Sequence, residues 1–147
     1  MALKIDKEVE NLIRAHANRV YPEECCGALF GKLDSDERII IDHMELDNAD
    51  DEGNRKRNFE ISPDDYMMAE KHADENAMVM AGVYHSHPDA APVPSEKDQR
   101  RAMPVFSYVI ISIKGGEQGE LRAWKINQEG RFEEETVGSV QEREPNS

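Results

Sequence analysis

The stretch that decides the fold is Met78-Val-Met-Ala-Gly-Val-Tyr-His-Ser-His-Pro-Asp-Ala-Ala-Pro-Val-Pro-Ser-Glu-Lys-Asp98. Its first part, residues 78–84, is an uninterrupted apolar run of strand length, which predicts a central strand buried on both faces. A rigid, proline-rich loop over residues 85–94 is predicted to end that strand. Ser95 and Asp98 then have the spacing of a helix capping box, which predicts a short helix that runs to about Met103.

Further elements are predicted on both sides of this stretch. Asp6 has the position of an N-cap, and apolar residues at helical spacing predict an amphipathic helix over residues 6–20. Ser62 and Pro63 predict the start of a second helix that runs to Asn76. Apolar runs between turn residues predict strands at 25–31 and 38–44, joined as a hairpin, and at 106–113, 120–126 and 131–136. The polar segment 45–57 has no periodicity and is predicted to be a long surface loop.

The order of these elements indicates the fold class. Helices alternate with strands, and hairpins lie near both ends, so the sequence predicts an α/β domain with a mixed sheet. The 147 residues suffice for one domain with one core and exclude a TIM barrel, which needs far more chain. We expect this domain to span residues 1–137 and the polar tail 138–147 to be disordered.

The charge of the chain excludes several classes of partner. Lys and Arg total 18 against 31 Asp and Glu, which gives a net charge of −13, so the surface repels nucleic-acid phosphates and anionic lipids. The first ten residues lack the apolar core of a signal peptide, and no apolar run approaches the roughly 18 residues of a membrane-spanning helix. We therefore expect a soluble, cytoplasmic protein with neither nucleic acid nor a membrane as partner. The acidity indicates either adaptation to high salt or a basic partner.

Two histidines and a carboxylate in the central stretch form a candidate metal site. His85 and His87 are two residues apart, so in a strand both imidazoles lie on one face and can bind one ion. Asp98 follows a returning loop and can supply a third ligand, which leaves a fourth position for water, as in catalytic zinc sites. Each element also has a plain structural interpretation, because surface histidines are common and Ser95-x-x-Asp98 caps a helix in any case.

These residues carry a family resemblance. His85-Ser86-His87-Pro88, followed after the loop by Ser95-x-x-Asp98, resembles the H-x-H-x7-S-x-x-D motif of the JAMM (MPN-plus, JAB domain) zinc metalloproteases of the small standalone prokaryotic type. Glu24-Cys25-Cys26-Gly27 resembles the E-x-C-G segment that supplies the catalytic Glu of the family. The resemblance covers approximately residues 5–126. It implies a cytidine-deaminase-like α/β fold, with one Zn²⁺ per chain held by the two histidines and Asp98.

The resemblance also implies roles for two further residues. Glu24 is expected to act as the general base that takes a proton from water and returns it to the leaving amine. Strand alternation places Glu23 on the opposite face, so we assign the role to Glu24. Ser95 is expected to donate a hydrogen bond to the developing oxyanion. A zinc deaminase is disfavoured, because the H-x-E and P-C-x-x-C signatures of that chemistry are absent.

Several other polar residues receive milder predictions. Cys25 and Cys26 are predicted to be reduced, buried thiols, because adjacent cysteines rarely satisfy disulfide geometry. Three histidines fall on predicted helix or strand faces away from the motif and are interpreted as non-ligands: His16, His43 and His72. The basic run 55–57 is interpreted either as a solvated loop or as a contact to an acidic carrier.

The resemblance favours one function and leaves others open. The favoured function is a zinc peptidase or isopeptidase that hydrolyses an amide bond at the C-terminal Gly-Gly tail of a ubiquitin-like sulfur-carrier protein, for example with release of cysteine. The extended tail of such a carrier would lie along a sheet edge. The alternatives are a deubiquitinase-like Lys isopeptidase and a non-catalytic, zinc-bound scaffold module. The sequence leaves the oligomeric state open.

Overall fold

The computed structural model describes residues 2–34 and 36–140. Seven strands, three α-helices and one short 3-10 turn follow one another along this part of the chain. They are β1 (Ala2–Asp6), α1 (Lys7–Val20), β2 (Cys26–Asp34), β3 (Glu37–Leu46), η1 (Glu52–Asn54), α2 (Pro63–Glu75), β4 (Val79–Pro88), α3 (Glu96–Arg101), β5 (Ser107–Lys114), β6 (Glu117–Ile126) and β7 (Phe132–Val140).

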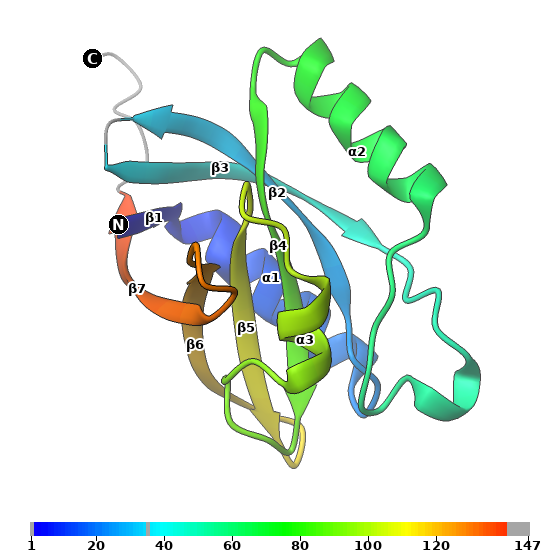
Figure 1. The fold of residues 1–147 in the computed structure, drawn as a ribbon. Coiled ribbons are helices and arrows are strands. Elements are labelled where there is room, and N and C mark those ends of the chain that lie inside the picture. Colours follow the sequence, from blue (N-terminus) through cyan, green and yellow to red (C-terminus); the bar gives the residue numbers. More distant parts are fainter. Residues whose placement is uncertain (1, 35, 141–147) are drawn as a thin grey trace.

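The strands form one mixed sheet that closes on itself. Neighbouring strands follow the order β1-β3-β2-β4-β5-β6-β7, and β1 also pairs with β7. The contacts of β1 with β3 and β7 and of β4 with β5 are parallel, whereas the other pairs are antiparallel. Figure 1 shows the strongly curved sheet with α1 on one side and α3 on the other. The predicted α/β class with a mixed sheet is confirmed.

Helix α1 covers the inner face of the curved sheet. Asp6 caps it, because its Oδ1 accepts a hydrogen bond from the Glu8 backbone N–H at 2.8 Å. Its apolar stripe is buried against β1, β3, β4 and β5, as the helical spacing predicted. The main core consists of this stripe and the inward side chains of the sheet, which include Leu3, Ile5, Leu29, Ile40, Tyr84, Val109 and Ile111.

A second core lies on the outer face of β2, β4 and β5. The N-cap of α2 is Ser62, whose hydroxyl accepts a hydrogen bond from Asp65 N–H, so the predicted start of this helix is confirmed. The small residues Ala69 and Ala73 of α2 are buried there with Phe30 and Val83. Because β4 has one core on each face, its side chains alternate between two apolar layers, as expected for a central strand.

The central strand is longer than predicted. Strand β4 continues through both histidines to Pro88, so the interpretation of residues 85–88 as loop is wrong. The physical reason is the neighbouring strand: β5 pairs in parallel with β4 as far as Pro88 and Ile113, which keeps the backbone extended. A proline can occupy this last position because the strand needs no further hydrogen bond from its nitrogen.

Both ends of the chain also differ from the prediction. The first strand, β1, was not predicted, since five residues carry too little periodicity and the strand is held by β3 and β7. Strand β7 reaches Val140 because residues 138–140 pair with β1, so the tail boundary at residue 138 is three residues early. The remaining tail, residues 141–147, lies outside the described residues. Within the described part of the chain, no helix is long and apolar enough to cross a membrane.

Candidate metal centre

The three predicted ligands converge at the C-terminal end of β4. The Nε2 atoms of His85 and His87 are 3.3 Å apart. The Asp98 Oδ2 atom lies 3.3 Å from the Nε2 of His85 and 3.4 Å from that of His87. Within residues 2–34 and 36–140, this is the only group of three His, Cys, Asp or Glu side chains whose candidate ligand atoms lie so close together.

The spacing of these three atoms fits a tetrahedral metal ion. Zinc binds imidazole nitrogen and carboxylate oxygen at about 2.0–2.2 Å, so two ligand atoms of a tetrahedral site lie about 3.3–3.5 Å apart. The three measured separations, 3.3, 3.3 and 3.4 Å, match that edge length. Two imidazoles and one carboxylate also leave a fourth position, as catalytic zinc sites do. The cluster can therefore hold a metal ion.

The capping box of α3 orients the carboxylate ligand. The Ser95 hydroxyl accepts a hydrogen bond from Asp98 N–H at 3.1 Å, and Asp98 Oδ2 accepts one from Ser95 N–H at 2.9 Å. The same Oδ2 atom faces both histidines. The structural interpretation of Ser95-x-x-Asp98 is thus correct, and it does not compete with the metal interpretation, because the cap fixes the ligand atom in place.

The two histidines are held by different contacts. His87 Nδ1 lies 2.9 Å from the Ala91 carbonyl oxygen, which fixes the proton on Nδ1 and leaves the Nε2 lone pair for a metal. His85 is fully buried and stacks on the Phe59 ring at a centroid separation of 4.4 Å. Neither contact was predicted, because both depend on long loops whose path the sequence pattern does not define.

The electrostatics of the cluster also suit a cation. Burial lowers the pKa of His85, which favours the neutral, metal-binding imidazole. Burial opposes ionisation of Asp98, but the adjacent His85 and His87 outweigh it and hold the pKa of that carboxyl well below its ordinary range. The cluster therefore presents a carboxylate and at least one neutral imidazole at neutral pH.

Glu24 is buried close to the cluster. Only 4% of its surface is exposed, and burial raises the pKa of its carboxyl to about 8. Glu24 and Ser95 line one cavity of about 320 Å³ together with the ligand His87. The structure thus brings the predicted catalytic residues together with the ligand cluster. Glu23 lines a different cavity, beside α1, although Glu24 and Cys25 border that cavity too.

The residues expected to be non-ligands lie elsewhere. His16 contacts the Tyr84 hydroxyl at 2.7 Å in the main core, and His72 contacts Asp42 at 2.9 Å. Cys25 and Cys26 are free and buried, as predicted. Burial raises the pKa of the Cys25 thiol to about 12, which leaves it protonated and a poor metal ligand.

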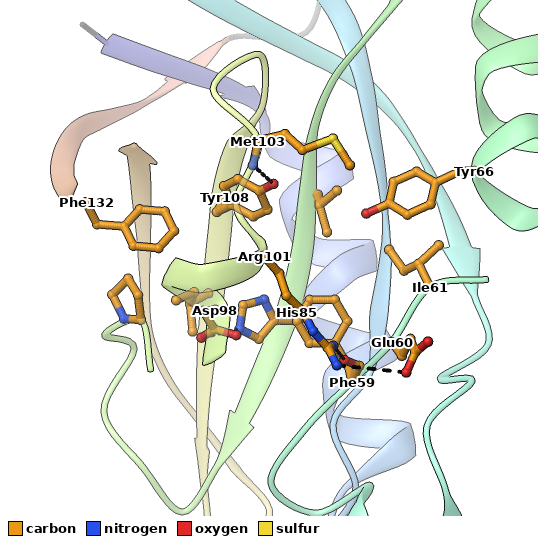
Figure 2. A pocket seen from close by; sticks show the side chains of 13 residues that line it. Phe59, Glu60, Ile61, Tyr66, His85, Asp98, Arg101, Met103, Tyr108 and Phe132 are labelled. Carbon is orange, nitrogen blue, oxygen red and sulfur yellow. Dashed lines mark hydrogen bonds and ion pairs between the residues drawn. The ribbon is translucent and has the colours of Figure 1, made fainter. Parts of the chain in front are cut away.

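A second, apolar cavity borders the ligands on another side. Its volume is about 260 Å³, and Figure 2 shows His85 and Asp98 at its wall beside several aromatic rings. Arg101 lies at its edge and donates a hydrogen bond to the Phe59 carbonyl oxygen at 2.7 Å. These rings were not predicted as part of the site. They make this side of the candidate ligands largely apolar. The aromatic side chains that line this cavity and are labelled in Figure 2 are Phe59, Tyr66, Tyr108 and Phe132.

Comparisons with known proteins agree with this geometry. The family model described as prokaryotic homologs of the JAB domain matches residues 6–127. The chain is 33% identical to the CysO-cysteine peptidase of Mycobacterium tuberculosis over 151 aligned positions, and the match covers 95% of this chain and 92% of that relative. It is 27% identical to a desampylase of Pyrococcus furiosus over 113 residues, 76% of this chain and 72% of the relative.

A solved structure shows the same fold. The solution structure of a protein from Desulfitobacterium hafniense has a TM-score of 0.83 and 30% sequence identity, and the match covers 95% of this chain and 94% of that one. Fold and site together define a JAB/MPN-type α/β domain with a candidate His-His-Asp metal centre. The chain belongs to the family of prokaryotic JAB domain homologues, and the predicted resemblance is confirmed.

Proposed function

We propose that this protein is a zinc-dependent peptidase that hydrolyses the amide bond after the C-terminal Gly-Gly of a ubiquitin-like sulfur-carrier protein, for example with release of cysteine. The observation that carries the proposal is the convergence of His85, His87 and Asp98 at tetrahedral ligand spacing beside the buried Glu24. The relative named CysO-cysteine peptidase, which matches nearly the whole chain, supports this substrate class.

The bound zinc ion would supply a Lewis acid that polarises the scissile carbonyl and lowers the pKa of water. Glu24 takes a proton from the attacking water and delivers it to the leaving amine. Burial makes this carboxylate a stronger base, and a metal ion held by the neighbouring residues would favour the ionised form that accepts the proton. The Ser95 hydroxyl lines the same cavity and donates a hydrogen bond to the developing oxyanion.

A deubiquitinase-like Lys isopeptidase is the second candidate, and the relative named desampylase favours it. Both reactions hydrolyse an amide at the same kind of centre and differ in the leaving amine. A zinc-bound scaffold without activity is disfavoured, because Glu24 and Ser95 share a cavity with the ligand His87. The carrier would be a protein partner in the cytoplasm, and the net charge of −13 disfavours nucleic acid and anionic membranes.

The experiment compares two substrates made from one ubiquitin-like carrier that ends in Gly-Gly. One carries a single C-terminal cysteine, and the other is joined through an isopeptide bond to the side chain of a lysine peptide. Each is incubated with the zinc-loaded protein and analysed by intact-mass spectrometry. We expect loss of the cysteine after Gly-Gly. Cleavage of the lysine isopeptide alone would favour the second candidate, and an intact mass for both substrates would contradict the peptidase proposal.

A further inference from the structure

A basic segment stands out in this acidic protein. Arg55, Lys56 and Arg57 are consecutive in a chain whose net charge is −13. None of the ion pairs between described residues includes Lys56 or Arg57. The two cations are therefore available to an anionic ligand.

The segment borders the catalytic cavity. Lys56 and Arg57 line the cavity of about 320 Å³ whose wall also contains Glu24, His87 and Ser95. Two cations thus face the hollow in which the proposed base, a metal ligand and the proposed oxyanion donor meet. A solvated loop elsewhere on the surface would not have this placement.

Hydrogen bonds fix the segment against the base. The Glu24 backbone N–H donates to the Arg55 carbonyl oxygen at 2.7 Å. The Asn48 side-chain amide donates to the Glu24 carbonyl oxygen at 3.1 Å and to the Asn58 carbonyl oxygen at 2.9 Å. The segment is therefore anchored on both sides of Lys56 and Arg57, and the backbone of Glu24 is one of its anchors.

We propose that Lys56 and Arg57 bind the free α-carboxylate of the residue that follows the scissile bond, so that the enzyme removes a single C-terminal amino acid. The proposal rests on the peptidase function proposed above. In a terminal amino acid, a single carbon atom separates the α-carboxylate from the scissile nitrogen, which places the carboxylate in the cavity that contains Glu24. A lysine isopeptide presents a run of methylene groups there and no carboxylate.

The chemistry of the two side chains fits this ligand. A guanidinium matches a carboxylate with two parallel hydrogen bonds, and a neighbouring ammonium adds a second positive charge. The overall negative charge of the protein repels an anionic substrate, and a local pair of cations offsets this repulsion at the cavity. The cations thus favour the α-amine of an amino acid over a lysine side-chain amine as the leaving group.

The test uses the carrier that ends in Gly-Gly-Cys in two forms, with a free C-terminal carboxylate and with a C-terminal amide. We expect the zinc-loaded protein to cleave the acid with a kcat/KM about tenfold or more above that of the amide, since hydrogen bonds to charged groups are the strong ones. In the double variant Lys56→Met and Arg57→Gln, the acid-to-amide ratio should fall toward one. The matched control, Lys71→Met with Arg131→Gln, removes the same charges from two exposed positions and should keep the wild-type ratio.

Binding provides a second readout that does not depend on cleavage. Calorimetric titration of the zinc-loaded Glu24→Gln variant with the two carriers should show tighter binding of the acid, and addition of the Lys56 and Arg57 substitutions should remove the difference.

Two outcomes would overturn the carboxylate proposal. The first is equal cleavage and equal binding of the acid and the amide by protein that keeps Lys56 and Arg57, which would leave the peptidase proposal intact. The second is equal weakening of both substrates in the double variant, which would instead indicate contact with the carrier body. If neither carrier is cleaved, the peptidase proposal fails, and the titration alone decides whether the cations recognise the carboxylate.

Discussion

At the scale of single residues, the proposed catalysis depends most on Glu24, which is buried next to the candidate ligand cluster without belonging to it. In Glu24→Gln we expect kcat to fall by about 10²-fold or more, because general acid–base catalysis contributes that much. Zinc content should stay at one ion per chain, because the three ligands remain. Steady-state kinetics and elemental analysis of the same preparation check both points. A variant that turns over normally would show that another group moves the proton.

The raised pKa of Glu24 gives a second prediction at this scale. In the metal-free protein, this carboxyl titrates near pH 8, compared with 4.5 for an ordinary Glu, because burial disfavours its charge. The folded state therefore binds more protons than the unfolded state between these values, and Glu24 lowers the free energy of unfolding as pH rises through that window. Glu24→Gln should thus gain stability relative to wild type from pH 5 to about pH 8 and no more above it. Urea unfolding of both metal-free proteins at several pH values measures this, and a difference that stays constant with pH would argue against a buried, protonated carboxyl.

At the scale of elements, Ser95 is the N-cap of helix α3, and we propose a second, separable role for it as an oxyanion donor. Ser95→Ala removes both and should cost about 1 kcal/mol in the free energy of unfolding and about 10²-fold in kcat. Ser95→Gly should cost only a few tenths of a kcal/mol, since glycine is tolerated at an N-cap, but should lose the same activity. Thermal unfolding and kinetics of the two variants separate the roles. Full activity in the glycine variant would make Ser95 a cap alone.

Local sequence patterns predicted some features of these elements and missed others. The spacing of His85 and His87 was enough to place both on one strand face, and Ser62 was enough to start α2, because these are local rules. The end of β4 was mispredicted because it is set by pairing with β5 and not by the prolines that follow. The contacts of His87 with Ala91 and of Asn48 with Glu24 also escaped prediction, since loop paths carry no periodic signal.

At the scale of the whole molecule, the net charge of −13 leads to a prediction about salt. Like charges destabilise the compact state, and salt shortens the Debye length from about 10 Å at 0.1 M to about 3 Å at 1 M. The Tm measured by calorimetry should therefore rise by several degrees over that range of NaCl. Matched measurements of Lys71→Met and Glu75→Gln should show a larger and a smaller rise, respectively. A Tm that falls with salt would show that attractive ion pairs outweigh the net repulsion.

In the proposed mechanism, the centre formed by His85, His87 and Asp98 acts together with Glu24 to cut an amide after Gly-Gly. The most direct measurement is the intact mass of a Gly-Gly-Cys carrier after incubation with metal-free protein, the same protein reloaded with zinc, and zinc-loaded Glu24→Gln. From this mechanism we expect loss of one cysteine residue with the reloaded wild type, no loss with the metal-free protein, and loss at a rate lower by about 10²-fold or more with Glu24→Gln. Cleavage that is equal in all three samples, or absent from the reloaded wild type, would contradict it.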